Sequence, residues 1–417
     1  MIYDLKELIT FARENSKFYR ALYQNLSSDI RLESLPILKQ EEFWKSNKFK
    51  NNELLTEDFS EGILFKSGGT SGHPKFSVFT EKEWSMFTEE FGKGISNGFL
   101  KDGDYVGNLF YAGELYASFA FIMKSLEKCP KKIVQFPMTG NMRNKDIVKT
   151  IEEYKINVLA GVPTTFINLA DYIQKNKIEI NIRLILFGGE PLYQDQITIL
   201  NHAFPNAAIA SIGIASVDGG HLGYFDPSCK NGEHKVFKDS TIIEIIDEDT
   251  NEKIVEPGRI GRLVYTNLTR KLMPIIRYPA GDRAEWIEYG AKFKLNGRSD
   301  EGARIGPVTL GSDDILNIFS EKNIGTSIMS FQLIINHQEG LDQLTILLVI
   351  DNETIIDKNQ LLCLLYKERP MIKQAVESKV IAGPVIKLVE IFELVKNERT
   401  GKKRLVIDLR EIESVSS

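Results

Sequence analysis

The sequence of 417 residues contains few cysteines and no long apolar run. Its three cysteines, Cys129, Cys229 and Cys363, are odd in number and far apart, which excludes a disulfide framework and a zinc site of the CxxC type. We expect reduced thiols, with Cys363 buried in the apolar run Leu361–Leu365. The longest apolar segments, such as Leu344–Ile350, are far too short to span a bilayer.

An excess of basic residues is also missing. The chain has 52 Lys and Arg against 57 Asp and Glu, with both signs mixed along its length. A surface for nucleic acid or for an anionic membrane is therefore not expected. The first residues carry acids and apolar side chains at helical spacing (Leu5, Leu8, Ile9, Ala12), not the basic start of a signal peptide. These features predict a cytoplasmic protein.

Residues 81–260 alternate short β-rich runs with helix-like segments. This alternation predicts a layered α/β domain with mostly parallel strands. The predicted strands are Val158–Val162, Leu184–Phe187 and Ala207–Ile212, and the predicted helices are Asn144–Tyr154, Thr165–Lys175 and Tyr193–Ala203. Next, two β-rich segments, Thr241–Asp247 and Gly261–Leu268, flank the turn at 256–258, which predicts an antiparallel subdomain.

The character of the sequence changes near Gly297. Residues 298–312 are rich in Gly, Asp and Arg with little apolar periodicity, so we expect a hinge or linker there. Beyond them we predict strands at Ser330–Ile335, Leu344–Ile350, Val385–Leu394 and Leu405–Leu409, and a helix at Lys358–Glu368. The expected fold is thus α/β: a large N-terminal layered α/β domain (1–297) with a β-rich subdomain, plus a small mobile α+β C-terminal domain (298–417).

A glycine-rich loop between two strand-like segments is the most informative stretch. Glycines let successive N–H groups converge on an anion, hydroxyls add donors and a lysine adds positive charge, which together suit phosphate. The residues concerned are Ser67, Gly68, Gly69, Thr70, Ser71, Gly72 and Lys75. It is not a Walker loop, because no Gly-Lys-Ser/Thr follows the glycines. A flexible surface turn is the alternative.

The loop resembles the Ser/Thr-Ser-Gly-Thr-Thr-Gly-x-Pro-Lys signature of adenylate-forming enzymes, the superfamily of acyl-CoA synthetases, peptide-synthetase adenylation domains and luciferases. Within it, the chain most resembles the phenylacetate-CoA ligase branch and its phenazine-biosynthesis relatives. Ser16–Arg20 is similar to that branch's Ser-Pro-Phe-Tyr-Arg, Leu35–Lys39 to its Leu-Pro-x-x-Lys, and Gly188–Pro191 to its Gly-Ala-Glu-Pro. These motifs and those below follow the family order over nearly the whole chain.

The resemblance implies a nucleotide site. Besides the loop, it assigns Gly188, Gly189 and Glu190 to ATP binding, and the family's aromatic-Gly-x-x-Glu motif maps onto Ile214, Ala215, Ser216 and Asp218. Asp218 takes the place of the family's Mg²⁺-binding glutamate and reaches one methylene less. The alternative for Asp218 is a plain residue of a glycine-rich turn.

Two further motifs complete the implied site. Arg277–Asp282 is similar to Tyr-Arg-Thr-Gly-Asp, so Asp282 would bind the ribose hydroxyls, with Pro279 in place of the family's arginine. Gly297–Asp300 resembles Gly-Arg-x-Asp, in which Arg298 would contact the nucleotide and Asp300 would be the pivot of domain rotation.

The segment 399–404 resembles the Ser-Gly-Lys stretch of the family's catalytic lysine. It assigns that role to Lys402, with Lys403 as the alternate; a basic surface turn is the other interpretation. By its place in the chain, the segment with Tyr111, Gly113 and Tyr116 would line the acyl pocket, although an aromatic stripe of this kind also suits plain core.

The implied activity is ATP- and Mg²⁺-dependent formation of an acyl-adenylate from a carboxylic acid, of aryl or arylacetic type. The acyl group would pass to the thiol of CoA or of the phosphopantetheine arm of an acyl carrier protein. We expect a monomer or homodimer. Two alternatives stay open: an acyl-protein synthetase that uses its own cysteine, and an inactive nucleotide-binding scaffold or sensor, suggested by Ile214, Asp218 and Pro279.

Overall fold

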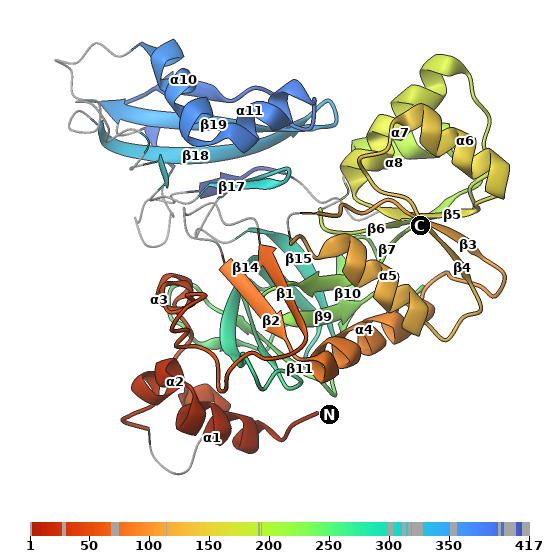
Figure 1. The fold of residues 1–417 in the computed structure, drawn as a ribbon. Coiled ribbons are helices and arrows are strands. Elements are labelled where there is room, and N and C mark those ends of the chain that lie inside the picture. The colour runs from red at the N-terminus through yellow and green to blue at the C-terminus, as the bar shows by residue number, and fades with distance from the viewer. Residues whose placement is uncertain are drawn as a thin grey trace. The chain divides into compact units, whose positions relative to one another are not determined.

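The computed structural model describes residues 2–26, 31–67, 75–113, 115–190, 192, 194–298, 303–310, 314–315, 318, 328–350, 357–390, 393–395 and 406–410. Its chain forms two compact units, a large one built mainly from residues up to Asn296 and a small one built mainly from Gly297 onward. Figure 1 labels helices and strands of both units.

A five-stranded parallel sheet forms one layer of the large unit, in the order β4-β3-β5-β6-β7. Its strands are β3 (Tyr105–Asn108), β4 (Val134–Pro137), β5 (Val158–Gly161), β6 (Leu184–Phe187) and β7 (Ala208–Ser211). Alternate residues of β5 point into different cores: Val158 and Ala160 pack with α4 and α5, whereas Leu159 packs with α6, α7 and α8. Helices therefore cover both faces, which explains the nearly continuous apolar runs of these strands.

The covering helices are α4 (Glu81–Ser96) and α5 (Ser118–Lys128) on one face, and α6 (Asn144–Tyr154), α7 (Pro163–Asn176) and α8 (Gln194–Ala203) on the other (Figure 1). Helix α4 begins with a capping box, since Thr80 Oγ1 accepts the Glu83 N–H and the Glu83 carboxylate accepts the Thr80 N–H.

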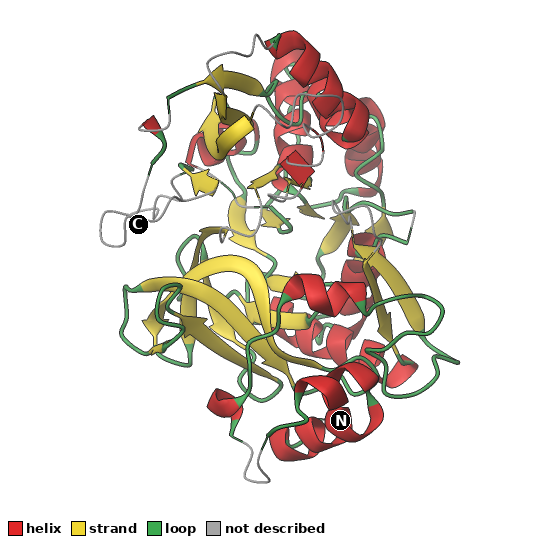
Figure 2. Cartoon of the chain, turned by 90° about the vertical axis from the view of Figure 1, so that its left-hand side faces the viewer, coloured by secondary structure: helices red, strands yellow, loops and turns green. Residues whose placement is uncertain are grey.

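An eight-stranded sheet forms the second layer, in the order β12-β11-β13-β14-β15-β10-β9-β8. Its strands are β8 (Ile214–Ser216), β9 (Gly220–Tyr224), β10 (Glu233–Val236), β11 (Thr241–Ile246), β12 (Lys253–Ile254), β13 (Ile260–Asn267), β14 (Ile275–Glu288) and β15 (Lys292–Arg298). The ladders between β11, β13 and β14 are antiparallel, as the sequence predicted for this subdomain. Figure 2 shows how strongly strands of the large unit curve.

The N-terminal helices pack on this second sheet and share its core. They are α1 (Leu5–Asn15), α2 (Lys17–Leu22) and α3 (Gln40–Lys45), with the 3₁₀ turn η1 (Leu32–Ser34) between α2 and α3. The predicted amphipathic first helix is confirmed, because Leu8, Ile9 and Ala12 are all buried in that core.

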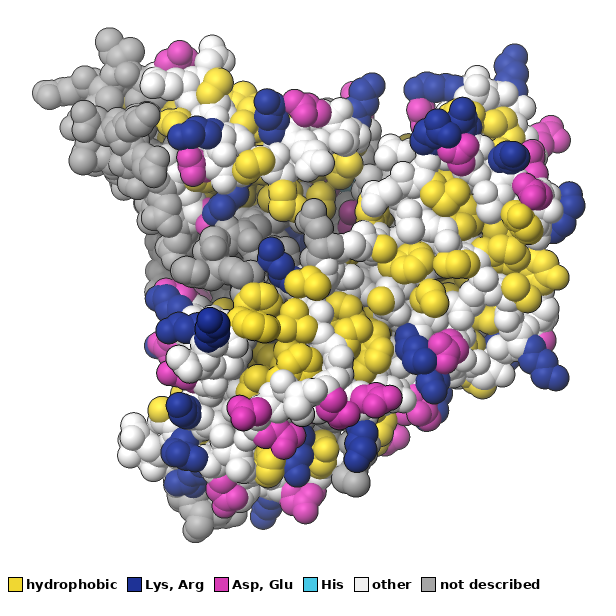
Figure 3. Space-filling model, in the orientation of Figure 1, with side chains coloured by type: hydrophobic (Ala, Val, Ile, Leu, Met, Phe, Trp, Pro, Cys, Tyr) yellow, Lys and Arg dark blue, Asp and Glu magenta, His cyan; other side chains and the backbone are white. Residues whose placement is uncertain are grey.

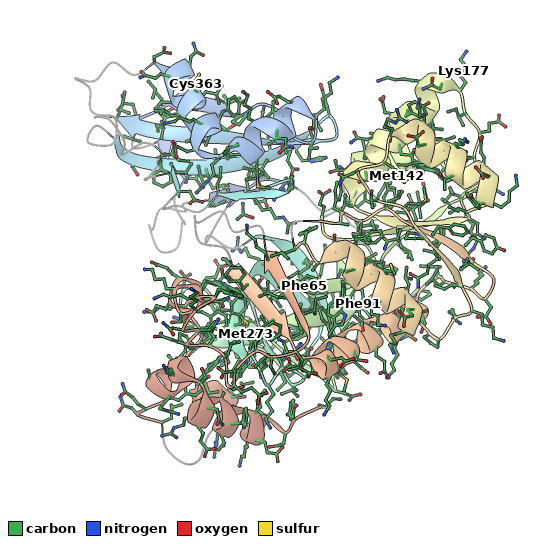
Figure 4. All side chains as sticks on the ribbon, viewed as in Figure 1. Phe65, Phe91, Met142, Lys177, Met273 and Cys363 are labelled. Carbon is green, nitrogen blue, oxygen red and sulfur yellow. The ribbon has the colours of Figure 1, made fainter. Side chains whose placement is uncertain are left out.

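A separate two-stranded hairpin carries the glycine-rich loop. Strand β1 (Ile63–Ser67) runs antiparallel to β2 (Lys75–Phe79). Phe65 and Phe79 anchor the hairpin on α4, their ring centroids lying 5.0 Å and 5.8 Å from that of Trp84. Figure 4 labels Phe65 on this hairpin beside Phe91 of α4, and Figure 3 shows hydrophobic side chains gathered on this face near β1, β2 and α5.

The small unit has a four-stranded sheet in the order β20-β19-β18-β21. Its strands are β18 (Ile328–Gln338), β19 (Leu341–Ile350), β20 (Val385–Leu388) and β21 (Val406–Asp408), and its helices are α10 (Lys358–Glu368) and α11 (Pro370–Glu377). The helices and the sheet share one core. The predicted fold class, a layered α/β part with a β-rich subdomain and an α+β C-terminal part, is confirmed.

Three local predictions in the small unit were wrong. Part of the expected linker is a hairpin of β16 (Ala303–Ile305) and β17 (Val308–Leu310), whose alternate apolar residues enter the core. The strand expected at Val385–Leu394 ends at Leu388. Cys363 is exposed at the surface of α10 (Figure 4), because helical spacing turns it away from the buried Leu361 and Leu365.

Candidate active site

The loop proposed to bind phosphate is closed by a strand pair. Ser67 and Lys75 face each other as the last pair of the β1–β2 ladder, which confirms the two predicted flanking strands. The ammonium of Lys75 lies 5.3 Å from the ring centroid of Trp44, over the indole face. The residues between them that we assigned to ATP, Gly68, Gly69, Thr70, Ser71 and Gly72, lie outside the described residues.

Arg270 joins this hairpin to the Asp218 segment. Its guanidinium donates from Nη1 to Ser77 Oγ at 3.1 Å and to the Asp218 carbonyl at 2.5 Å, and from Nη2 to the Val78 carbonyl at 2.6 Å. The side chain is fully buried, and burial lowers the pKa of Arg270 from its ordinary value. Sequence reasoning missed this residue, since its only signal was a basic side chain just before the apolar stretch Leu272–Ile276.

The Asp218 turn is tightly built. The Asp218 N–H donates to Ser216 Oγ at 3.2 Å, and its Oδ2 accepts the hydroxyl of Tyr278 at 3.2 Å. A Cβ on the next residue, Gly219, would lie 1.9 Å from the Tyr265 ring, so only glycine fits there. The two interpretations of Asp218 are thus compatible: it stands in a glycine turn, and that turn fixes its backbone.

A buried tryptophan orients the tyrosine that contacts Asp218. Trp44 Nε1–H donates to Tyr278 Oη at 2.9 Å. Burial, together with the nearby Asp218 carboxylate, raises the pKa of Tyr278 well above its ordinary value. Tyr278 therefore stays protonated and acts as a neutral hydrogen-bond donor to the carboxylate. Neither Trp44 nor Tyr278 was singled out from the sequence.

Asp282 and Asp218 act on the same buried phenol. Asp282 lies on β14 after Gly281, which has φ +76°, and is half-buried. Tyr265 has its pKa raised above the usual range, first by burial and then by the charges of Asp218 and Asp282. The charges of the two carboxylates assigned to metal and ribose thus both raise the pKa of one buried phenol. Ile214, Ala215 and Ser216 form the edge strand β8 and are half-buried.

Arg277, two places before the position of the family's arginine, has a structural role. Its guanidinium makes a double ion pair with Glu244, Nε to Oε2 and Nη2 to Oε1, each 3.0 Å. Nη1 also donates to the Leu35 carbonyl, and the Arg277 carbonyl accepts the Leu38 N–H at 3.0 Å. Burial raises the pKa of Glu244, opposed by the charge of Arg277. This guanidinium fastens the 35–39 motif to the sheet.

The Gly188–Gly189–Glu190 segment follows β6. The Gly188 N–H donates to the Gly161 carbonyl at 3.1 Å, and a Cβ on Gly188 would lie 2.7 Å from Ile212 Cγ2. The Glu190 carboxylate accepts the N–H and the hydroxyl of Thr164 at 3.2 and 2.7 Å. Thr164 is in the first turn of α7, so this carboxylate also caps a helix N-terminus. An ATP contact by Glu190 stays a prediction.

The residues predicted to line the acyl pocket differ in exposure. The Tyr111 hydroxyl lies 3.2 Å from Thr165 Oγ1, and the side chain is half-buried. Gly113 has φ +104° with open space where a Cβ would be. Tyr116 is 45% exposed, which is more than a plain core residue would show.

The remaining predicted residues are not placed. Arg298 ends β15, and its side chain lies outside the described part of the chain, as do Asp300, Lys402 and Lys403. Within the described residues, no three His, Cys, Asp or Glu side chains gather as a metal site. Cys129 and Cys229 are buried. No helix in the described ranges is long and apolar enough to cross a membrane.

Two histidines near these motifs are structural. His221 is buried with its Nε2 2.6 Å from Ser240 Oγ, and burial lowers the pKa of His221 to about 3. His234 Nε2 lies 2.9 Å from Ser211 Oγ, and burial lowers the pKa of His234 to about 4. Both rings are therefore neutral at ordinary pH.

Comparison with known proteins gives a consistent class. No protein-family model matches the sequence. A phenylacetate-coenzyme A ligase of Thermus thermophilus is 24% identical over 324 residues, covering 75% of this chain and 70% of that protein. An indoleacetate–lysine synthetase of Pseudomonas savastanoi is 26% identical over 290 residues, covering 68% and 66%. The crystal structure of a 2-hydroxyisobutyryl-CoA ligase with 2-HIB-AMP and CoA superposes with TM-score 0.74 at 18% identity, covering 98% of this chain and 88% of the other.

The chain thus resembles adenylate-forming ligases in its fold and in the order of the motifs along it. Among these ligases, its sequence is similar to phenylacetate-coenzyme A ligases, at 24% and 26% identity in two of them. The resemblance found in the motifs is thereby confirmed, while the roles of individual residues stay predictions.

Proposed function

We propose that this protein activates a carboxylic acid with ATP and transfers the acyl group to the thiol of coenzyme A. One observation carries the proposal. Three motifs far apart in the sequence, those of Lys75, Asp218 and Tyr278, meet through the Trp44, Tyr278 and Arg270 contacts. Two proteins similar to this chain are named as coenzyme A ligases, which supports carboxylate activation as the chemistry of the place where these motifs meet.

In the first half-reaction, a carboxylate oxygen of the acid attacks the α-phosphorus of ATP. The bond from that phosphorus to the bridging oxygen breaks, which yields an acyl-adenylate and pyrophosphate. The loop from Ser67 to Lys75 holds the β- and γ-phosphates, Asp282 accepts the ribose hydroxyls, and Lys402 balances the negative charge that develops. Catalysis of this kind is mainly positioning and electrostatics.

Asp218 is the residue proposed to hold Mg²⁺ with ATP. A carboxylate supplies the hard oxygen that this ion prefers, and one or two carboxylates suffice because Mg²⁺ keeps several waters and phosphate oxygens. The turn around Asp218 fits this task, since its N–H, its carbonyl and Oδ2 are each held by a hydrogen bond. When bound, the ion neutralises charge on the phosphates.

In the second half-reaction, a thiol attacks the carbonyl carbon of the adenylate, AMP leaves, and the thiol proton passes to solvent. We propose that the small unit turns about Asp300 between the two steps, which keeps water from the adenylate. Two relatives are named for phenylacetate and indoleacetate, which supports an arylacetic substrate here. Because the second is named for lysine, an amine acceptor is the competing proposal to coenzyme A and a carrier-protein arm.

The test is ATP–pyrophosphate exchange against a panel of aryl, arylacetic, aliphatic and amino acids, followed by acyl transfer to coenzyme A, a phosphopantetheine carrier or lysine. Lys402→Ala and Asp282→Ala should each lower exchange by about 100-fold or more. Lys387→Ala and Asp239→Ala, both exposed, serve as matched controls and should leave it unchanged. Nucleotide binding without exchange for any acid would favour the scaffold alternative.

A further inference from the structure

Trp44 of α3 is in contact with two of the motifs assigned to the nucleotide. One face of its indole lies under the Lys75 ammonium, 5.3 Å from the ring centroid. Its Nε1–H donates to the Tyr278 hydroxyl at 2.9 Å, and its ring packs edge-on against that of Tyr278 with centroids 6.2 Å apart. The side chain is buried. One rigid group thus touches both the end of the phosphate loop and the start of the 278–282 motif.

The indole also decides which way the Tyr278 proton points. A phenol has one proton to donate, and its oxygen here already accepts the Trp44 N–H. The proton is therefore available for Asp218 Oδ2, at 3.2 Å. Tyr278 is 1% exposed, so water does not compete for this proton. The three groups form a directed chain from Trp44 through Tyr278 to Asp218.

This chain of hydrogen bonds compensates for the short side chain of Asp218. Asp218 reaches one methylene less than the glutamate it replaces, so its carboxylate has less freedom to find the ion by rotating. A carboxylate on this shorter side chain can bind the ion only if it is already oriented toward it. Hydrogen bonds from buried partners orient metal-binding carboxylates in this way, and removing such a partner lowers metal affinity by about 10- to 100-fold.

We propose that Trp44 and Tyr278 are positioning residues: Tyr278 aims the Asp218 carboxylate at the metal–nucleotide complex, and Trp44 aligns Tyr278 while it holds Lys75. The inference rests on the proposed function of this site. It assigns to α3, an N-terminal element without any of the superfamily motifs, control over how the phosphates and their cation are held.

The experiment measures Mn²⁺ binding in place of Mg²⁺ by electron paramagnetic resonance, with a non-hydrolysable ATP analogue and no acid substrate. Tyr278→Phe should weaken Mn²⁺–nucleotide binding about 10- to 100-fold, and Trp44→Phe should shift it in the same direction. Trp286→Phe is the matched control, because it also removes a buried indole N–H bond, that to the Ile254 carbonyl at 3.0 Å. It should leave Mn²⁺ binding unchanged.

A double-mutant cycle separates positioning from loss of fold. Tyr278→Phe in an Asp218→Asn background should cause no further loss, since the carboxylate it aims is gone. Circular dichroism checks that each variant is folded. In steady state, the Tyr278 variant should raise KM for Mg·ATP more than it lowers kcat.

Wild-type Mn²⁺ affinity in Tyr278→Phe, or additive losses in the double variant, would overturn the inference. Mn²⁺ binding needs no turnover, so the two proposals can fail separately. If no acid supports pyrophosphate exchange while Mn²⁺–nucleotide binding still depends on Tyr278, the proposed function fails and the positioning role stands.

Discussion

Removing the guanidinium of Arg277 should destabilise the large unit severely. In Arg277→Met, Glu244 would remain fully buried without the ion pair that the two 3.0 Å contacts provide. Breaking a buried pair from one side costs about 3–5 kcal/mol, because an uncompensated charge stays inside. The Leu35 carbonyl would also lose its donor. We expect a loss of about 4 kcal/mol or more in the free energy of unfolding.

The loss should grow with pH. Burial already raises the pKa of Glu244, and the charge of Arg277 opposes that rise. Without Arg277 the folded-state pKa rises further above the unfolded value of about 4.3. The folded protein then binds more protons than the unfolded chain, so stability falls as pH increases through this interval. The variant should be closest to wild type near pH 5 and furthest from it near pH 8.

Urea unfolding followed by tryptophan fluorescence is the assay. All three tryptophans, Trp44, Trp84 and Trp286, lie in the large unit, so the signal reports that unit alone. The double variant Arg277→Met/Glu244→Met is the control and should recover much of the loss, because no charge is left buried. An unchanged midpoint in the single variant, a double variant no better than the single, or a midpoint that rises with pH would refute the reasoning.

Three shorter predictions concern other sites. Gly219→Ala should unfold the Asp218 turn or abolish nucleotide binding. Gly383→Ala, where a Cβ meets nothing within 4 Å, should do neither. Equal nucleotide binding by the two variants would contradict this prediction. The pKa of His221 is lowered to about 3 in the folded protein. The stability that its neutral ring contributes above pH 6.5 should therefore be lost as pH falls, by about 1.4 kcal/mol per pH unit. In His221→Gln, the urea midpoint should depend less on pH below 6.5. A maleimide should label the native protein at Cys363 alone, with acyl transfer intact, and loss of transfer would revive the cysteine-relay alternative.

Much of the fold follows from local pattern. The strand Leu184–Phe187 and the helices Asn144–Tyr154 and Lys358–Glu368 occur with the predicted bounds, because buried strands and amphipathic helices have strong periodic signals. The hairpin at 303–310 escaped prediction because its strands have three residues each. Its apolar residues are set among Gly, Pro and Arg, which hides their alternation.

The contacts that build the site could not be predicted in the same way. Resemblance pointed to Asp218 and Asp282, since their motifs are local in sequence. The partners of Asp218 are not local: Tyr278 lies 60 positions away and Arg270 lies 52 positions away. Trp44, which orients Tyr278, lies 234 positions from that tyrosine. Nothing in a single sequence marks a buried indole as the neighbour of a distant phenol. Arg277 shows the reverse case, since a residue near the expected nucleotide contact instead holds two elements together.

The hairpin of β1 and β2 has a consequence for protein engineering. It forms a two-stranded sheet of its own and, among the described residues, shares no ladder with the eight-stranded or the five-stranded sheet. It is held by the aromatic contacts with α4 and the Arg270 bonds to Ser77 and Val78. The Lys66 N–H also donates to the Leu115 carbonyl at 2.9 Å, and Asn47 Nδ2 donates to the Phe76 carbonyl at 2.5 Å. We therefore expect that residues 63–79 can be exchanged as a cassette between relatives, provided that Phe65, Phe79, Lys75 and the Ser77 hydroxyl are kept. Chimeras of this kind would test whether the loop proposed to bind phosphate works together with the acid-binding residues of another relative.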